Sequence, residues 1–232
     1  MVVLGIETST KTGSVAIISE RGVIAQYSLN IEVTHSERLM TTVDRVLKDT
    51  GIAMKQVDGF AVANGPGSFT GLRIGLSTVK GLSFATSKPV VTVPTLKALA
   101  WNVPYSSFPI CPLLDARKNE VYAALYSFNG ASLVQTLPEQ VITLGKLAAH
   151  IKGKTVFTGE GAYLFQAEID KLFGSSALFA PHSVALPSAA AVAEIGLDLL
   201  KKGAPSDPDD LTPMYIRRPE AEIAWERKQT SR

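Results

Sequence analysis

The stretch Asn64-Gly65-Pro66-Gly67-Ser68-Phe69-Thr70-Gly71-Leu72-Arg73-Ile74-Gly75 is the most specific segment of this sequence. It follows an apolar run typical of a buried strand (60–64) and opens a segment with helical spacing (71–86). No Lys-Ser or Lys-Thr pair follows the glycines, so the segment is not a P-loop. Thr70 stands where a dinucleotide fingerprint needs its third glycine. We therefore expect a loop whose amides bind an anion or allow another backbone to approach closely.

Around this segment the sequence predicts one order of elements twice. The first half is expected to contain strands 2–7, 13–19 and 23–30, helix 35–50, strand 60–64, helix 71–86 and strand 89–93. The second half is expected to contain strands 110–115, 120–127 and 132–136, helix 143–150, strand 155–158, helix 162–173 and a last helix at 188–202. Each half runs strand, strand, strand, helix, strand, helix, which is typical of mixed sheets covered by helices. The pattern predicts a two-lobed α/β fold of the actin/hexokinase (ASKHA) type.

The chain divides, on this interpretation, into an N-terminal lobe at 1–103, a C-terminal lobe at 104–205 and an extended tail at 206–232. Thr34 and Glu37 form a candidate capping box for the first helix, and Ser188 is the candidate N-cap of the last one. The acidic, proline-broken stretch 206–210 ends the predicted folded body. After it, 213–218 is expected to pack back in extended form. The end of the chain is basic, and its interpretation stays open between a solvated tail and a minor contact with RNA or a partner. The basic residues are Arg217, Arg218, Arg227, Lys228 and Arg232.

Composition excludes several classes of function. No apolar run approaches the roughly 18 residues that span a bilayer, and the N-terminus lacks a signal-peptide pattern, so we expect a cytoplasmic protein without membrane contact. The net charge of +2 is too small to indicate nucleic-acid binding by itself. Cys111 is the single cysteine, which rules out an intramolecular disulfide. Its apolar neighbours favour a buried thiol over a nucleophile.

The first hairpin of each half carries a similar polar turn. Glu7-Thr8-Ser9-Thr10 follows the first strand, and Asp115-Ala116-Arg117-Lys118 follows the corresponding strand of the second half. Hydroxyls and turn amides of this kind can hydrogen-bond an anion, so the two turns are candidate phosphate loops facing each other across a cleft. Ordinary polar hairpin turns are the alternative. The nucleotide-binding candidates are Glu7, Thr8, Ser9, Asp115 and Arg117.

With these motifs in view, the chain resembles the TsaB family, also called YeaZ. The resemblance is carried, in order along nearly the whole chain, by 5–10, 35–37, 65–75, 115–117 with 120–122, and 213–217. It implies an actin-like fold and a role as a partner subunit in the machinery that installs threonylcarbamoyl on tRNA adenosine next to the anticodon. One departure is Glu7, where the family usually has Asp, so the reach of this side chain differs while its charge is kept.

The resemblance also implies that this chain is not the catalyst and has no protease activity. In the catalytic paralogue, TsaD, two histidines spaced i and i+4 bind the metal after the strand that follows the glycine helix. The matching positions here are Thr95 and Leu99, and a leucine cannot ligate a metal. His35, His150 and His182 share no ligand spacing. We therefore expect no catalytic residue and no metal, with ATP or ADP bound only weakly or at the interface of a complex.

In the family, the first two helices form the interface with TsaD. The implied contact candidates are His35, Leu39, Val43, Gly71, Arg73, Gly75 and Thr78. Small residues at helical spacing (Gly71, Gly75, Thr78, Gly81 and Ala85) form a ridge that could receive a partner's helix, or could pack on the protein's own sheet. A TsaE-like ATPase, and tRNA held by the complex, are the further implied partners. Homodimer formation by the isolated chain is left open.

Two other classes of function compete with this interpretation. One is a stand-alone ATP-dependent small-molecule kinase of the same fold, for which Thr158-Gly159-Glu160-Gly161-Ala162 could be the adenosine-binding turn. No residue is a clear catalytic base for it. The other is a self-associating module outside the tRNA pathway.

Overall fold

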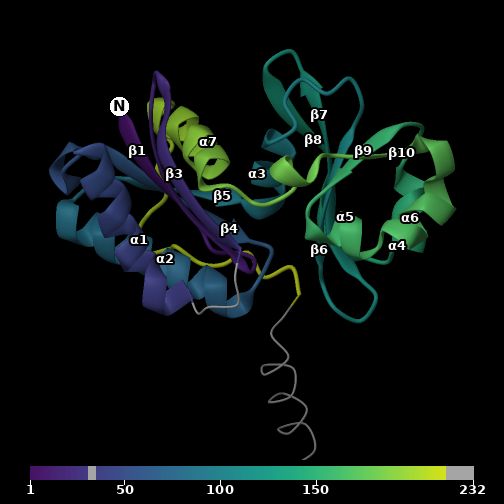
Figure 1. Ribbon diagram of the computed structural model, residues 1–232, viewed down its shortest axis with the longest axis horizontal. Helices are drawn as coiled ribbons and strands as arrows, with labels where there is room; N and C mark the ends of the chain where they lie inside the picture. The colour runs from purple at the N-terminus through teal and green to yellow at the C-terminus, as the bar shows by residue number, and fades with distance from the viewer. Residues whose placement is uncertain (31–34, 218–232) are drawn as a thin grey trace, which may run out of the picture.

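A computed structural model describes residues 1–30 and 35–217, with side chains at 1–30 and 38–217, and contains two five-stranded sheets (Figure 1). The first part of the chain forms β1 (Val2–Glu7), β2 (Thr12–Ser19), β3 (Gly22–Asn30), α1 (His35–Thr50), β4 (Gly59–Gly65), α2 (Phe69–Thr86), β5 (Val90–Pro94) and α3 (Thr95–Trp101). The second part forms β6 (Ile110–Asp115), β7 (Val121–Asn129), β8 (Ser132–Ile142), α4 (Leu144–Leu147), β9 (Thr155–Thr158), α5 (Glu160–Leu164), α6 (Gln166–Phe173), β10 (Ala177–Phe179) and α7 (Ala189–Lys201). Short 3-10 turns lie at Met54–Gln56, Ala148–His150, Gly174–Ser176 and His182–Val184.

The two sheets repeat one topology, which confirms the duplication predicted from the sequence. Their strand orders are β3-β2-β1-β4-β5 and β8-β7-β6-β9-β10. In each, the first two strands pair antiparallel, while the first and fourth pair parallel. The two lobes therefore have the fold class that was expected.

Several element boundaries differ from the prediction. The expected helix at 143–150 is the short α4 followed by a 3-10 turn, and the one at 162–173 divides into α5 and α6. The strand expected at 132–136 extends to Ile142. α3 and β10 were not predicted, because seven- and three-residue elements give too few periods to identify.

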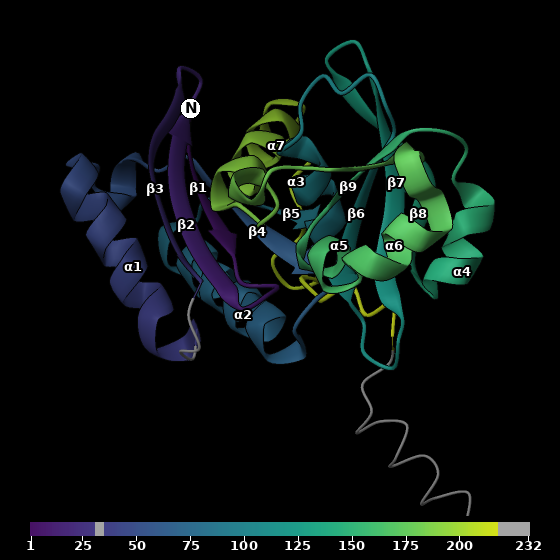
Figure 2. The ribbon, with the colours of Figure 1, turned by 45° about the vertical axis from the view of Figure 1, so that its right-hand side comes forward.

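Helices cover both faces of the first sheet (Figures 1 and 2). One face packs on α1 and α2, where Leu39, Val43 and Val79 join Ile6 and Phe60 in a single core. The opposite face packs on α7, which contributes Val192 and Ile195 to a second core. Alternating inward and outward side chains on the strands thus produce a three-layered lobe.

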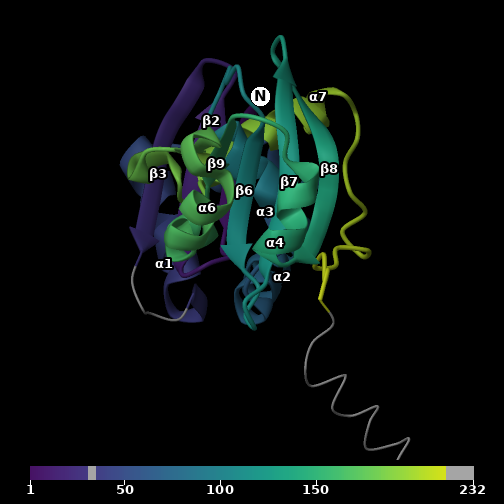
Figure 3. The same cartoon turned by 90° about the vertical axis from the view of Figure 1, so that its right-hand side faces the viewer.

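The second sheet has the same layering (Figure 3). Its outer face is covered by α4, α5 and α6, through a core that contains Leu147, Ala162 and Ile169. Its other face receives α3, whose Leu96 and Leu99 pack with Leu114 and Tyr126.

α3 and α7 connect the two lobes. α7 lies within the range predicted as the C-terminal lobe, 104–205, yet it packs on the first sheet. Two glycines fit this packing: a Cβ on Gly5 would lie 2.4 Å from the carbonyl oxygen of Ala189, and one on Gly196 would lie 2.3 Å from the Cβ of Ala61. α7 therefore belongs to the first lobe by its contacts, although it follows the second lobe in the sequence.

Local signals at helix ends hold where they can be checked. Gly51, with φ of +67°, follows α1, and the Ser188 hydroxyl accepts a hydrogen bond from the amide of Ala191 at the start of α7. Thr34 of the expected capping box and the basic residues from Arg218 onward lie outside the described residues.

Burial raises the pKa of the Cys111 thiol, as expected of a core cysteine. Among the described helices, none has the length and apolar character needed to cross a bilayer.

Candidate functional site

The glycine-rich loop packs against the turn between β1 and β2. The amide of Ser68 donates to the carbonyl of Ser9 at 2.6 Å, and the Thr8 hydroxyl donates to the carbonyl of Gly71 at 2.8 Å. A Cβ on Gly67 would lie 2.2 Å from the oxygen of Ser9, so only glycine allows this approach. Of the two expectations for this loop, the described contacts bear out close backbone approach, and the backbone is the protein's own.

The first half of the small-residue ridge faces inward. Gly71 and Gly75 are buried, and a Cβ on Gly75 would lie 2.4 Å from the Thr8 hydroxyl oxygen. Leu39 and Val43 are 6% and 1% exposed in the first core. These four residues face the protein's own sheet and turn, so they are not presented on the surface of the isolated chain.

The outer face of α2 carries the exposed residues. Phe84 is 89% exposed, the highest value among the exposed large hydrophobic residues. Ser77, Gly81 and Ala85 are also exposed, and Thr78 is half-buried. On the neighbouring helix α1, Met40 is 51% exposed. The side chain of His35 is not among those that the structure describes.

Glu7 ends β1 as a buried carboxyl beside the glycine loop. One carboxyl oxygen accepts a 2.5 Å hydrogen bond from the amide of Ser9, and the other is buried with no hydrogen-bond partner among the described residues. Burial raises the pKa of Glu7 to about 7, and the hydrogen bond from Ser9 only partly offsets this. The raised pKa moves the titration of Glu7 toward neutral pH.

The corresponding turn of the second lobe follows β6. Asp115 is half-buried and accepts from the amide of Arg117 at 2.8 Å, while Arg117, Lys118 and Asn119 have left-handed backbones with φ of 63°, 56° and 57°. Glu160, at the start of α5, lies within reach of the charges of Asp115, Lys11 and Arg117. Burial, followed by the Asp115 charge, raises the pKa of Glu160.

The charges of Lys11, beside the first turn, and of Asp115 and Arg117, in the second, all act on Glu160. Arg117 lies 3.9 Å from the Asp115 carboxylate, whereas the Thr8 hydroxyl is engaged with Gly71 of α2. Sequence analysis did not select Glu160 as a site residue, although it stands in the Gly-Glu-Gly turn quoted for adenosine. Gly159 and Gly161 of that turn pack on Leu113 of β6, with Cβ positions 2.3 Å and 2.9 Å from its backbone.

Thr95 and Leu99, the positions that the resemblance aligned with TsaD metal ligands, are closed to solvent. Thr95 and Leu99 are both 0% exposed on α3, and Leu99 packs in the core beneath the second sheet. His182 is stacked on Tyr163 with ring centroids 4.0 Å apart. In the part of the chain given with side chains, no three His, Cys, Asp or Glu residues gather as a metal site would require.

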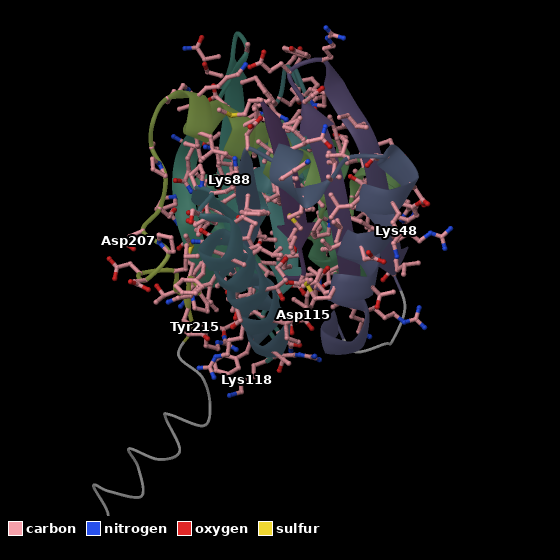
Figure 4. All side chains as sticks on the ribbon, turned by 90° about the vertical axis from the view of Figure 1, so that its left-hand side faces the viewer. Lys48, Lys88, Asp115, Lys118, Asp207 and Tyr215 are labelled. Carbon is pink, nitrogen blue, oxygen red and sulfur yellow. The ribbon has the colours of Figure 1, made fainter. Side chains whose placement is uncertain are left out.

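The C-terminal segment (residues 206–217) runs back across both lobes, as the expectation of an extended return predicted. The amide of Ser206 donates to Val90, and that of Met214 donates to the carbonyl of Asn64. Figure 4 places Tyr215 at the same end of the molecule as Asp115 and Lys118. The backbone of the glycine loop is therefore covered on this side.

Side chains fasten this segment at two places. Tyr215 stacks on Phe69 at 5.0 Å between ring centroids, and Arg73 lies over Phe69 while donating to the Tyr215 hydroxyl at 2.9 Å. Arg217 donates to the carbonyl of Ala116 and pairs with Glu120 across the second turn. Arg73, expected as a partner contact, is thus engaged within the chain. The roles of Phe69 and Tyr215 could not be predicted from the sequence, because no local signal indicates them.

Duplicated sheets of this topology, with polar turns facing one another between them, define a two-lobed protein of the actin/hexokinase class. The ROK hexokinase of Thermus thermophilus shares this fold, with a TM-score of 0.53 over 88% of this chain and all of that one, at 10% sequence identity.

Closer relatives define the family. A family model described as "TsaD: tRNA N6-adenosine threonylcarbamoyltransferase" matches residues 23–225. The Bacillus subtilis "tRNA threonylcarbamoyladenosine biosynthesis protein TsaB" is 32% identical over 97% of this chain and 98% of its own length. The structure of YeaZ from Pseudomonas aeruginosa superimposes with a TM-score of 0.79 at 27% identity, over 92% of this chain and 99% of that one. The chain belongs to the TsaB (YeaZ) family.

Proposed function

We propose that this chain is a non-catalytic subunit in the biosynthesis of tRNA threonylcarbamoyladenosine and acts by binding a TsaD-like catalytic paralogue. Its curated relatives carry this biosynthesis in their names. The observation that carries the non-catalytic role is the pair Thr95 and Leu99, both wholly buried. A leucine packed in the core beneath the second sheet offers no ligand atom, and the Thr95 hydroxyl is a poor ligand for a transition metal.

The surface proposed to dock the paralogue is the outer face of α2. Phe84 supplies an exposed ring of the kind that anchors protein interfaces. Its neighbours Ser77, Gly81 and Ala85 are small, which allows a second helix to approach closely. This surface takes the place of the inward-facing Gly71, Gly75, Leu39 and Val43. A TsaE-like ATPase and tRNA would join through the complex, and the same face is available for self-association of the isolated chain.

The test is reconstitution with the TsaD-like and TsaE-like proteins of the same cell. We expect Phe84→Asp to weaken binding of the TsaD-like protein by about 5- to 30-fold, because an anchor ring contributes roughly 1–2 kcal/mol or more. tRNA modification should fall in parallel and recover at higher concentration of the variant. The matched control is Leu172→Asp, which charges a residue that is 41% exposed on α6 of the other lobe. An unchanged affinity for the Phe84 variant would place the interface elsewhere.

ATP or ADP, on this proposal, binds the cleft weakly or only within the complex. Several turn donors that could hold phosphates are engaged within the chain: the Thr8 hydroxyl donates to Gly71, the Ser9 amide to Glu7 and the Arg117 amide to Asp115. The Ser9 hydroxyl is buried without a hydrogen-bond partner among the described residues. Calorimetry on the isolated chain should give no affinity tighter than about micromolar. A sub-micromolar dissociation constant would contradict this part of the proposal.

A further inference from the structure

Three aromatic rings line a pocket away from both polar turns. Trp101 ends α3, Tyr105 follows in the connection to β6, and Phe128 ends β7. The ring centroids of Trp101 and Phe128 are 6.0 Å apart, and those of Tyr105 and Phe128 are 5.8 Å apart. α7 closes the pocket with Ala190, Ala191 and Glu194. None of these residues takes part in the proposed function.

The rings are fixed in place by the two lobes. Trp101 packs against the core under α7, and Phe128 packs against the core under the second sheet. Tyr105 is 73% exposed and has a left-handed backbone with φ of 56°, a conformation that bulky side chains seldom adopt. The unfavourable backbone conformation of Tyr105 thus holds its ring beside the ring of Phe128 and leaves it exposed to solvent. Such outliers concentrate at ligand sites.

A carboxylate completes the wall. Glu194 is exposed on α7, and one of its oxygens accepts a 2.8 Å hydrogen bond from the indole N–H of Trp101. That bond orients the indole. The other carboxylate oxygen of Glu194 has no ion-pair or hydrogen-bond partner among the side chains that the structure describes. Glu194 therefore adds a negative charge to the lining that the three rings share.

We propose that this pocket binds a quaternary or methylated ammonium group. Cations are attracted to aromatic faces, and a methylated ammonium can be enclosed by rings without needing hydrogen-bond acceptors. A guanidinium fits less well, because it has five N–H donors to satisfy and Glu194, which also accepts from Trp101, is the one carboxylate among the described residues that line the pocket. The ammonium could belong to a free choline-like molecule or to a trimethyllysine side chain.

Trp101 provides the readout. The chain has two tryptophans, so in a Trp225→Phe background, with excitation selective for tryptophan over tyrosine, the fluorescence reports on Trp101. Titration with choline should change this fluorescence with a Kd of about 1–10 mM, as suits a ligand of so few atoms. The neutral isostere 3,3-dimethylbutan-1-ol should bind more weakly. N-acetyl-trimethyllysine amide is the third arm: tighter binding than choline assigns a lysine side chain as the source, and weaker binding assigns a free small cation.

Variants separate cation recognition from simple burial. Tyr105→Leu keeps an apolar side chain but removes a ring, and Glu194→Gln keeps an acceptor for the indole but removes the charge. Each should weaken choline binding by about 2- to 5-fold, the equivalent of one exposed cation–π contact. Phe108→Leu, which removes a 39% exposed ring outside the pocket lining, is the control and should leave choline binding unchanged. Three results would overturn the proposal. They are equal binding of choline and its neutral isostere, no fluorescence change at about 50 mM choline, which is about five times the upper expected Kd, and choline binding that neither variant weakens.

Discussion

Two glycines of α2 should respond in opposite ways to the same substitution. Gly75 and Gly81 both lie inside this helix. A Cβ on Gly75 would lie 2.4 Å from the Thr8 hydroxyl oxygen, whereas a Cβ on Gly81 would meet nothing within 4 Å. We expect Gly75→Ala to destabilise the protein and Gly81→Ala to stabilise it, although helix propensity favours alanine equally at both positions.

The magnitudes follow from three contributions. Alanine gains about 0.5–1 kcal/mol over glycine inside a helix, which is the whole effect expected at Gly81. At Gly75 the Thr8 side chain must rotate, which forfeits its hydrogen bond to Gly71, worth about 1 kcal/mol, and adds roughly 1–3 kcal/mol of overpacking. The net loss at Gly75 is about 1–3 kcal/mol. For a chain of this size that lowers Tm by roughly 2–12 °C, and Gly81→Ala raises it by roughly 1–4 °C.

A double-mutant cycle with Thr8→Ala isolates the cause. The other atoms near the Gly75 Cβ are Val62 Cγ2 at 3.5 Å and Thr8 Cβ at 3.7 Å, which are ordinary contact distances. Without the Thr8 hydroxyl, Gly75→Ala should be neutral or slightly stabilising, so thermal or urea unfolding should give a coupling energy of about 1–3 kcal/mol. Additive effects, or a Gly75→Ala protein as stable as the Gly81→Ala one, would refute this assignment of the inward face.

Two further predictions concern the cleft and the C-terminal segment. The pKa of Glu7 is raised above 4.5, so the stability that protonated Glu7 contributes is present below about pH 4.5 and is lost as pH rises through about 7. Between pH 4.5 and 8, the free energy of unfolding of Glu7→Gln should therefore rise by about 2–4 kcal/mol relative to that of the unsubstituted chain, as measured by urea unfolding. A difference that stays constant with pH would contradict this prediction. Arg217→Ala should increase amide hydrogen exchange in residues 206–217 and lower the free energy of unfolding by about 1–3 kcal/mol. Arg217→Lys should restore protection only partly, because a lysine cannot reach Ala116 and Glu120 together. Unchanged exchange in Arg217→Ala would show that this anchor is unimportant.

The fold could be predicted from the sequence because its signals are local and repeated. Alternating strands, the apolar stripe of α1 and the strand–glycine–helix segment each occupy consecutive residues, and the same order occurs twice. The path of α7 could not be predicted, since the Gly196 contact with Ala61 joins residues 135 positions apart. Nothing in the local pattern indicates which sheet an apolar helix will cover.

The candidate site was less predictable for the same reason. Helical spacing placed Gly71, Gly75, Gly81 and Ala85 on one ridge, but the ridge is broad enough that its first half faces Thr8 while Gly81 and Ala85 face solvent. The engagement of Arg73 with Tyr215 spans 142 residues. Glu160 acquires its raised pKa from burial and from Asp115, neither of which is visible along the chain.

The contacts around the two turns also favour the proposed docking through the outer surface of α2. The Ser9, Gly71, Asn64 and Ala116 carbonyls accept hydrogen bonds from Ser68, Thr8, Met214 and Arg217 respectively. Each bond satisfies within the chain a group that stands at the inner edge of a lobe, and the C-terminal segment supplies two of the four donors. Opening this region to a phosphate would require breaking several of these bonds, each worth about 1 kcal/mol. Phe84 needs no such rearrangement to meet a partner, so binding through α2 leaves the folded state intact.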